Sequence, residues 1–579
     1  MVNRSRATRI VENQNTDSKP IRVLNIVSKL WYVWLLILVP GILQLLYSRY
    51  GFAPTDDGFV MAYSRRILSG QLPHIDFISI RPAGSAILHS VFVLIGGDFT
   101  LYLSRLFVWF EFSFIAASSL IIAERFLRIK LNLIVKVCLA LISIFISAHF
   151  FPLMAWYTTD GIFMILLGST VTLAGSQRSK YVGYFLIGFS YLCKQNFLLA
   201  ALVAPFIFSD WKNWRIWLAV FLPGFFYLLP ALFTGDYIDY TSQLFTQSNI
   251  QLTGVIAYKY SYPFLQSIVV GSLMSALFYL PPFKFRKRKY YLALCAGSLL
   301  LFWTLKDYLP QLSSLKYLTI GSFALAGIFT GNLIVASVSG LFPWKFVKFN
   351  LYIGLIVWSA SISIGYNNPT LGCGLLISML LIQIIYLWQH TLTDRTTFQA
   401  FTILSALSTL LLLTFTFYYF DSGRKMLIYE DLPQNRLKSS LAGRLYGGRG
   451  ILTNSSTAAY YDDLNATISS LAGKTYAILP ENAAYWIKAS QQNPLPIDWP
   501  NNFEVNAKTE ARLEKSVDNL LKENGVVILE KYYAAGFSTG LYPMQPSDGQ
   551  ASVQYPIWSF VKNNYHRVSE SNYFEVYGK

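Results

Sequence analysis

The chain has 579 residues, of which 54% are hydrophobic and 13% are charged, and its formal net charge is +17. Soluble globular proteins carry about 25% charged residues, so this composition excludes a soluble multidomain enzyme and a disordered protein. The four cysteines show no CxxC or CxxH spacing, which argues against a disulfide framework and a cysteine metal site.

The positive charge lies in the hydrophobic part of the chain. Residues 421–579 carry 16 Lys and Arg and 16 Asp and Glu, so the whole net charge belongs to residues 1–420. Hydrophobic sequence combined with basic loops is typical of an integral membrane protein that follows the positive-inside rule. The charge therefore indicates an orientation in a membrane, and we expect no nucleic-acid partner.

Apolar runs long enough to cross a bilayer, about 20 residues each, recur between residues 30 and 420. Basic residues gather in alternate loops between these runs, which places the N-terminus in the cytoplasm. An odd number of spans then places the C-terminus outside, and we expect the inner (plasma) membrane of a bacterium. We predict thirteen membrane-spanning helices, centred near residues 40, 112, 143, 167, 187, 202, 223, 271, 298, 328, 357, 380 and 409.

The loop between the first two predicted spans, residues 50–100, is too long for a simple connector. In residues 57–70 apolar side chains recur at helical spacing, with Arg65 and Arg66 on the other side. This pattern predicts an amphipathic helix in the membrane interface. The apolar stretch at residues 85–96 is too short to span a bilayer and predicts a re-entrant or interfacial helix.

The tail after the last span is polar and of mixed pattern. Residues 476–481 and 525–533 predict strands, and residues 506–524 predict a helix with charges on one face. The fold class is therefore an α-helical polytopic membrane protein with a C-terminal α/β extracytoplasmic domain. Its predicted parts are a cytoplasmic segment (1–29), a transmembrane catalytic domain (30–420) and the extracytoplasmic domain (421–579).

Two adjacent carboxylates, Asp56 and Asp57, follow the first predicted span. A helix N-terminus stabilises an ionised carboxylate, so one of the pair could act as a general base or as a metal ligand at neutral pH. The alternative is plain helix capping by Asp56.

Other ionisable residues share the predicted outer face, namely Asp160, Lys194 and Arg81. Charged groups beside spans are costly and usually functional. The two cations suit the oxygens of a lipid phosphate, and an aspartate would take the proton of an acceptor hydroxyl. A lysine that snorkels from a helix end is the alternative for Lys194. His74, in the first outer loop, could line the same site, and a surface histidine is the alternative.

The remaining polar and aromatic residues point less clearly to chemistry. Glu111 lies in the middle of a predicted span, and we interpret it as a helix-packing group. His89, His149 and His390 are scattered and make no metal-binding pattern. We interpret most of the aromatic residues as markers of the membrane interface and not as platforms for a sugar.

Several short motifs along the chain resemble, in their order, those of the GT-C superfamily of glycosyltransferases. TDDG at residues 55–58 and RPAG at 81–84 resemble the acidic pair and the K/R-P-P-G element of their first outer loop. WYTTDG at 156–161 resembles their second outer-loop aspartate motif, and LCKQN at 192–196 resembles a later lysine element. The similarity is to the branch that uses polyprenyl-phosphate sugars, which includes protein O-mannosyltransferases and the lipid A aminoarabinose transferase.

The resemblance implies a role for each matching residue. Asp56 would be the catalytic base or its main electrostatic partner, Asp57 would assist or help to bind a metal, and Asp160 would be the second acidic residue of the site. Arg81 and Lys194 would hold the phosphate of the donor. The metal is left open, because some members use a divalent cation such as Mg²⁺ or Mn²⁺ and the sequence holds no ligand set that decides the question.

The resemblance also implies the reaction. A hexosyl- or pentosyltransferase of the cell envelope would move a sugar from a polyprenyl monophosphate to a lipid, glycan or protein acceptor, with inversion at the anomeric carbon. The alternatives are a flippase or other transporter of lipid-linked glycan, and a polymerase or ligase. A transporter should show paired half-repeats and polar helices near the midplane, and a polymerase or ligase should depend on a long late outer loop.

Overall fold

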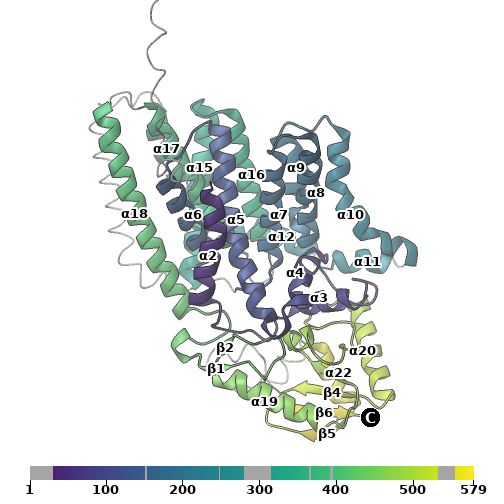
Figure 1. Cartoon of the computed structure of the whole chain (residues 1–579). Helices are drawn as coiled ribbons and strands as arrows, with labels where there is room; N and C mark the ends of the chain where they lie inside the picture. Colours follow the sequence, from purple (N-terminus) through teal and green to yellow (C-terminus); the bar gives the residue numbers. More distant parts are fainter. Residues whose placement is uncertain are drawn as a thin grey trace, which may run out of the picture.

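The structure is a computed structural model of the chain. An α-helical bundle forms its larger part, and a smaller domain built on a four-stranded sheet lies at one end of the bundle (Figure 1). The structure describes residues 30–149, 153–235, 237–246, 248–279, 315–363, 367–391, 395–531 and 555–579.

The helices of the bundle lie where the hydropathy of the sequence predicts them. Every predicted centre from residue 40 to 271 and from 328 to 409 falls inside a helix, and the span predicted near residue 298 lies outside the described residues. The helices are α2 (Trp31–Tyr47), α5 (Thr100–Leu127), α6 (Leu133–Ser147), α7 (Tyr157–Thr172), α8 (Gln177–Cys193), α9 (Leu198–Ile207), α10 (Trp214–Thr234), α13 (Tyr262–Tyr279), α15 (Leu315–Ser339), α16 (Trp344–Ser361), α17 (Cys373–Thr391) and α18 (Arg395–Met426).

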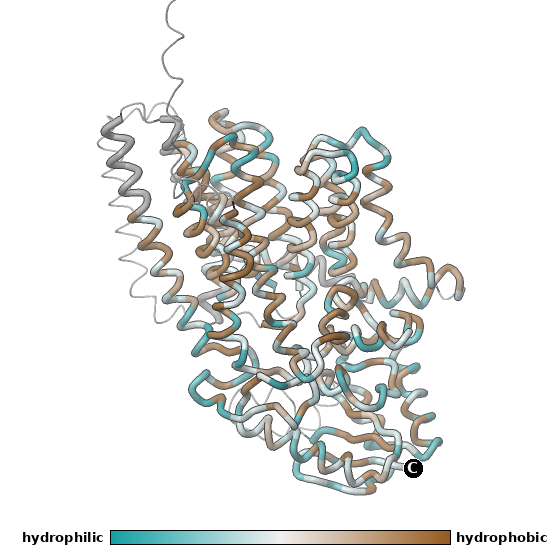
Figure 2. Tube along the Cα trace, in the orientation of Figure 1, coloured by the Kyte–Doolittle hydropathy of each residue, from teal (hydrophilic) through white to brown (hydrophobic). Residues whose placement is uncertain are grey.

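Within the described residues, four helices are both long and apolar enough to cross a membrane. Others, such as α2 and α6, are apolar but shorter. Hydrophobic residues cover the bundle along its length, whereas hydrophilic residues gather at its ends and in the small domain (Figure 2). A mostly helical, membrane-type bundle is thus confirmed, and the number of thirteen spans stays a prediction. The four helices that are long and apolar enough to cross a membrane are Gly97–Leu127, Trp214–Thr234, Thr319–Ser339 and Thr370–Leu387.

The first outer loop contains the two predicted short helices, α3 (Phe59–Leu68) and α4 (Gly84–Ile95). The amphipathic helix is present as α3, which packs against α4 and the short helix η6 (Ala483–Ile487) of the small domain. Its position in the membrane interface stays a prediction. Arg66, predicted on the side opposite the apolar residues, is buried and forms an ion pair with Asp498 at 2.7 Å. The N-cap of α3 is Gly58, so Asp56 does not cap the helix.

Two short helices between α10 and α13 were not expected from the sequence. They are α11 (Tyr237–Leu244) and α12 (Ser248–Lys259). α11 contacts the first outer loop, since the Gln243 side-chain amide donates a hydrogen bond to the His74 carbonyl at 2.8 Å. The first outer loop is therefore enclosed by the bundle as well as by the small domain.

The small domain confirms the predicted strands and helix of the tail. β3 (Tyr476–Leu479) and β4 (Val526–Glu530) are parallel, and α20 (Ala507–Lys522) connects them. Asn506 caps α20 in a capping box with Thr509, which satisfies amide groups at the start of the helix. The sheet order is β3-β4-β6-β5, and the other elements are β1 (Ser439–Ser440), β2 (Leu452–Thr453), α19 (Ser455–Ser469), α22 (Pro556–Asn564), β5 (His566–Glu570) and β6 (Phe574–Gly578).

The strands β3 and β4 are buried on both faces, which explains their continuous apolar sequence. On one face Ile478 and Ile528 pack in a hydrophobic core together with Phe59 and Tyr63 of α3. On the other face alternate strand residues pack against α20 and α22. The first outer loop thus forms one layer of the small domain's core, although more than 300 residues separate the two segments in the sequence.

The helix ends divide the molecule into two sides. α5 begins beside the small domain, where the Leu101 amide donates to the Gly447 carbonyl at 3.1 Å, and ends at Leu127 on the far side (Figure 1). The basic loop after α5 therefore lies at the end of the bundle away from the small domain. This agrees with alternating loops of different charge, while the side of the membrane that each end faces stays a prediction.

Candidate active site

A cavity of about 120 Å³ lies between the ends of the bundle helices and the small domain. It brings together three of the residues selected from the sequence, Asp56, Arg81 and Lys194. Each comes from a different segment: the start of the first outer loop, the loop before α4, and the end of α8. The cavity walls are largely aromatic, formed by Phe59, Trp156, Tyr157, Trp499 and Phe503.

The TDDG motif is held in place by the small domain. The Thr55 hydroxyl donates to the Glu481 carbonyl at 2.5 Å, and the Ala484 amide donates to the Pro54 carbonyl at 2.9 Å. A Cβ atom on Gly58 would lie 2.1 Å from the Ala484 nitrogen, so the contact requires glycine. The motif is therefore a backbone junction between the first outer loop and the start of η6, and its two aspartates are oriented by that junction.

Asp56 faces the cavity in a nearly closed environment, with 8% of its surface exposed. The Tyr429 hydroxyl donates a hydrogen bond to its Oδ2 atom at 2.6 Å. Burial raises the pKa of Asp56 to about 6, against the hydrogen bond from Tyr429, which lowers it. The carboxylate is thus ionised at neutral pH but is close to the pH range in which it takes up a proton.

Asp57 points away from the cavity towards α5. Arg105 donates from Nη2 to both carboxylate oxygens of Asp57, at 3.0 and 3.1 Å, and the Ala53 amide donates to Oδ2 at 2.9 Å. Because both oxygens are held by N–H donors and the nearest charge is a cation, the surroundings of Asp57 do not fit a metal ion. Asp57 instead fixes the backbone that presents Asp56.

Arg81 lies against the aromatic wall and is shared with the small domain. Its Nη1 atom donates to Glu504 Oε1 at 2.7 Å. The guanidinium carbon lies 5.2 Å from the ring centre of Tyr157 and 5.7 Å from that of Phe59, distances at which a cation is attracted to an aromatic face. One edge of the guanidinium is thus held by the protein, and the group stays positively charged beside Asp56.

Lys194 is a buried cation without a carboxylate at ion-pair distance among the described residues. Its Nζ atom donates to the Thr158 hydroxyl at 2.9 Å and to the Ala360 carbonyl at 3.3 Å. Burial, and then the positive charge of Arg81, lower the pKa of Lys194 to about 7. Such a group gains free energy from any anion that enters the cavity.

His74 lies outside the cavity, in contact with α10 and α11. Its Nε2 atom is hydrogen-bonded to the Tyr227 hydroxyl at 2.7 Å, and its ring packs on Tyr240 with centres 4.4 Å apart. Burial lowers the pKa of His74 to about 4, so the ring is neutral at pH 7. The Tyr227 hydroxyl also accepts from the Ala83 amide at 2.9 Å, so this group supports the RPAG turn that carries Arg81.

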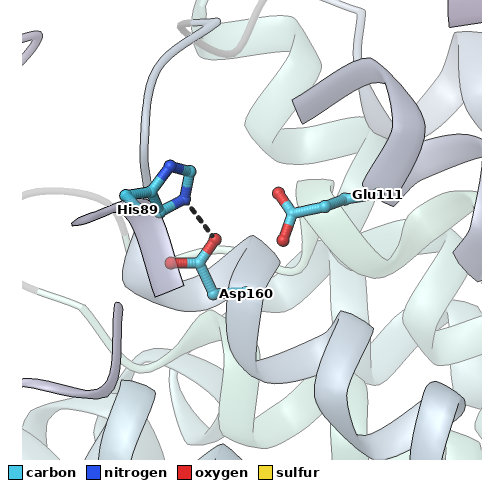
Figure 3. Close-up of side chains that lie close together, drawn as sticks. All are labelled: His89, Glu111 and Asp160. Carbon is cyan, nitrogen blue, oxygen red and sulfur yellow. Dashed lines mark hydrogen bonds and ion pairs between the residues drawn. The ribbon is translucent and has the colours of Figure 1, made fainter. Parts of the chain in front are cut away.

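Asp160 also lies outside the cavity. It belongs to the first turn of α7, and the residues at the very start of that helix line the cavity. It is fully buried and pairs with His89 Nε2 at 3.1 Å. Glu111 joins these two, so the expectation that His89 takes part in no metal-type pattern is wrong. The three residues come from α4, α5 and α7 and meet only in the folded chain (Figure 3).

Several residues of the cavity were missed by the sequence analysis. Tyr429 follows α18 and Glu504 precedes α20, and neither stands in a motif that indicates a site. Thr158 stands in the WYTTDG motif but was passed over in favour of Asp160. The aromatic lining corrects our interpretation of the aromatic residues, because six of them surround the cavity and three of these come from residues 421–579.

No family model and no curated protein matches the chain. Among solved structures the chain is similar to ArnT from Cupriavidus metallidurans bound to undecaprenyl phosphate (10% identity, 95% of this chain and 98% of that chain, TM-score 0.38). The same protein in the apo state matches at 12% identity, over 96% and 98% of the two chains, with a TM-score of 0.38.

A further similar structure is the archaeal oligosaccharyltransferase AglB from Archaeoglobus fulgidus, in complex with an inhibitory peptide and a dolichol-phosphate. It matches at 12% identity, over 89% of this chain and 72% of that chain, with a TM-score of 0.38. Similarities of this identity and TM-score assign no activity to the chain.

Proposed function

We propose that the chain is an integral membrane glycosyltransferase that transfers a sugar from a polyprenyl-phosphate donor to a hydroxyl group of an extracytoplasmic acceptor. The observation that carries the proposal is the cavity in which a buried carboxylate, Asp56, lies with two cations, Arg81 and Lys194. A base and an anion-binding pair in one closed space are the groups that this transfer needs.

The two cations suit the phosphate of the donor in different ways. Among the described residues Lys194 has hydroxyl and carbonyl partners only, so a phosphate oxygen would give it an anionic partner. Arg81 is held on one edge by Glu504, which leaves other N–H groups for a second phosphate oxygen. The position of the cavity at the end of the bundle would let the polyprenyl chain lie in the bilayer while its phosphate enters.

The transfer step follows from these roles. The oxygen of the acceptor hydroxyl attacks the anomeric carbon of the sugar, and the bond from that carbon to the phosphate oxygen breaks. The hydroxyl proton passes to the Asp56 carboxylate, and the polyprenyl phosphate leaves with its negative charge held by Arg81 and Lys194. Attack on the side opposite the phosphate inverts the anomeric carbon. The aromatic wall would pack against the sugar ring.

The neighbouring polar residues act as positioning residues in this proposal. Asp57 and Arg105 fix the backbone at Asp56, and His74 supports the turn of Arg81 through Tyr227. No step is assigned to a metal ion at Asp57.

Transport is not favoured by the position of the cavity. A carrier needs a site near the middle of the membrane that opens alternately to both sides. Here the small domain contributes Trp499, Phe503 and Glu504 to the cavity, so the site lies at one end of the bundle. This arrangement suits an enzyme that works at one surface.

The proposal is tested in a strain that lacks the gene, by mass analysis of its glycolipids and envelope glycans. The wild-type chain should restore the missing sugar. Asp56→Asn should be expressed and inserted normally but should lose about 10²- to 10⁴-fold in transfer rate, the usual contribution of a general base.

Asp76→Asn is the matched control for Asp56→Asn. Asp76 is an exposed aspartate of the same loop, and its carboxylate accepts only the nearby Leu72 amide among the described residues, at 2.6 Å. This variant should restore the sugar fully. Wild-type restoration by Asp56→Asn would refute the assignment of the base.

A further inference from the structure

The cluster of His89, Glu111 and Asp160 is placed by three helices in the interior of the protein. His89 comes from α4, Glu111 from the middle of α5 and Asp160 from the first turn of α7. One nitrogen or oxygen atom from each residue lies within 4.8 Å of the others, and all three side chains have no exposed surface. The Glu111 carboxylate points towards the paired His89 and Asp160 (Figure 3).

The cluster has more acceptor oxygens than the described part of the protein satisfies. Asp160 Oδ1 pairs with His89 Nε2, but Asp160 Oδ2 and both oxygens of Glu111 have no donor among the described residues, apart from a proton that the two carboxyl groups could share. The rings of Phe92 and Phe107 pack on His89, with centres 5.8 and 5.5 Å away. Two carboxylates in apolar surroundings carry a high electrostatic cost unless a cation neutralises them.

We propose that His89, Glu111 and Asp160 bind a divalent transition-metal ion, Zn²⁺ in particular. Two carboxylates and a neutral imidazole around such an ion form a complex without net charge, which suits an apolar interior. An imidazole nitrogen among the ligands favours Zn²⁺ over Mg²⁺ and Ca²⁺, which prefer oxygen alone.

The geometry around the histidine is compatible with this assignment. The 3.1 Å separation of His89 Nε2 and Asp160 Oδ1 is close to the spacing of two ligands that each lie about 2.0–2.1 Å from one zinc ion. The other ring nitrogen, Nδ1, is hydrogen-bonded to the Ser104 hydroxyl at 3.3 Å. A hydrogen bond at Nδ1 fixes the ring and leaves Nε2 for the metal.

The ion would hold α4, α5 and α7 together beside the cavity. The first turn of α7 carries Tyr157 and Thr158 on the cavity wall, and the Thr158 hydroxyl is the partner of Lys194. None of the three ligands lines the cavity. The ion is therefore a structural ion that positions α7, and the inference stands whether or not the proposed reaction is correct.

The test uses the full chain purified in detergent, stripped with a chelator and then dialysed against Zn²⁺ or Mg²⁺. Elemental analysis of the wild-type chain should find one zinc ion per chain and no retained magnesium, and Zn²⁺ should raise the temperature of thermal unfolding. Glu111→Gln should lose both effects. Glu124→Gln, the same change on the same helix at a residue that pairs with Lys136 at 2.9 Å, should keep both.

Equal zinc content and equal thermal response in wild type and in Glu111→Gln would overturn the proposal. The cluster would then be explained by a proton that Glu111 and Asp160 share. Should Glu111→Gln fail to fold, zinc X-ray absorption of the wild-type chain decides. It should show nitrogen and oxygen ligands, including an imidazole, at about 2.0–2.1 Å. The absence of bound zinc after dialysis, or a shell without imidazole, would refute the site.

Discussion

Burial moves the protonation equilibria of Asp56 and Lys194 towards each other. It raises the pKa of Asp56 to about 6 and lowers that of Lys194 to about 7, since a low dielectric disfavours the charged form of either group. Asp56 is ionised above its pKa, and Lys194 is charged below its own. Both groups therefore have the protonation state that the proposed transfer needs only in a narrow range around neutral pH.

The first prediction is a narrow bell-shaped pH profile of the transfer rate at low donor concentration, measured between about pH 5 and pH 9. The rate should rise as Asp56 loses its proton near pH 6 and fall as Lys194 loses its proton near pH 7. Lys194→Arg should remove the fall on the alkaline side, because arginine stays charged in this range.

Tyr429→Phe separates the two limbs of that profile. The hydroxyl of Tyr429 lowers the pKa of Asp56, so its removal should move the acid limb to higher pH and leave the alkaline limb in place. An acid limb that does not move in Tyr429→Phe would show that a group other than Asp56 governs it.

The helix α3 is joined to the small domain by a buried ion pair. Arg66 donates from Nε and Nη2 to the two oxygens of Asp498, at 2.7 and 2.8 Å. Nη2 also donates to the Leu495 carbonyl at 2.8 Å, and Nη1 donates to Gln71 at 3.0 Å. Since only 7% and 1% of the two ion-paired side chains are exposed, water cannot replace either partner.

We predict that Asp498→Ala lowers the free energy of unfolding by about 3–5 kcal/mol, because it leaves the Arg66 charge buried and unpaired. The double variant Arg66→Met with Asp498→Leu should recover much of that loss. Glu570→Ala, which removes the ion pairs of an exposed carboxylate with Lys531 and Arg567 in the same domain, should change little. Thermal unfolding and limited proteolysis in detergent measure the difference, and equal effects of the two single variants would contradict the role of the buried pair.

The two ends of the molecule differ in their charge, and the small domain covers only one of them. One end carries the small domain and the cavity, and the basic loop after α5 lies at the other. We predict that a tag after Lys579 is cleaved by protease added to spheroplasts, whereas a tag before Met1 is protected until the membrane is opened. Protection of the tag after Lys579 would contradict the odd number of spans.

Features that depend on local sequence were predicted well. The helices of the bundle follow from apolar runs, and β3, β4 and α20 follow from short periodic patterns, because both signals lie within one element. Asp56, Arg81 and Lys194 were selected from motifs, and the structure brings them to one cavity. Their catalytic and phosphate-binding roles stay predictions.

Features that depend on contacts between distant segments were not predicted. The hydrogen bond from Tyr429 to Asp56 joins residues 373 positions apart, and that of Arg81 to Glu504 joins residues 423 positions apart. The sequence around each partner gives no sign of the other. For the same reason neither the ion pair of Arg66 with Asp498 nor the pairing of His89 with Asp160 was predicted, since only the folded chain brings these residues together.

The core that the first outer loop shares with the small domain determines when the site can form during synthesis of the chain. The ribosome releases TDDG and α3 early, but the residues that cover them, from Ile478 to Glu504, follow the last span. Until that late segment has reached the same side of the membrane, Gly58 has no partner at η6 and the cavity lacks a wall. A chain halted during insertion therefore holds the TDDG and RPAG motifs without a closed site, and the cavity is complete only after the residues up to Glu504 have been added.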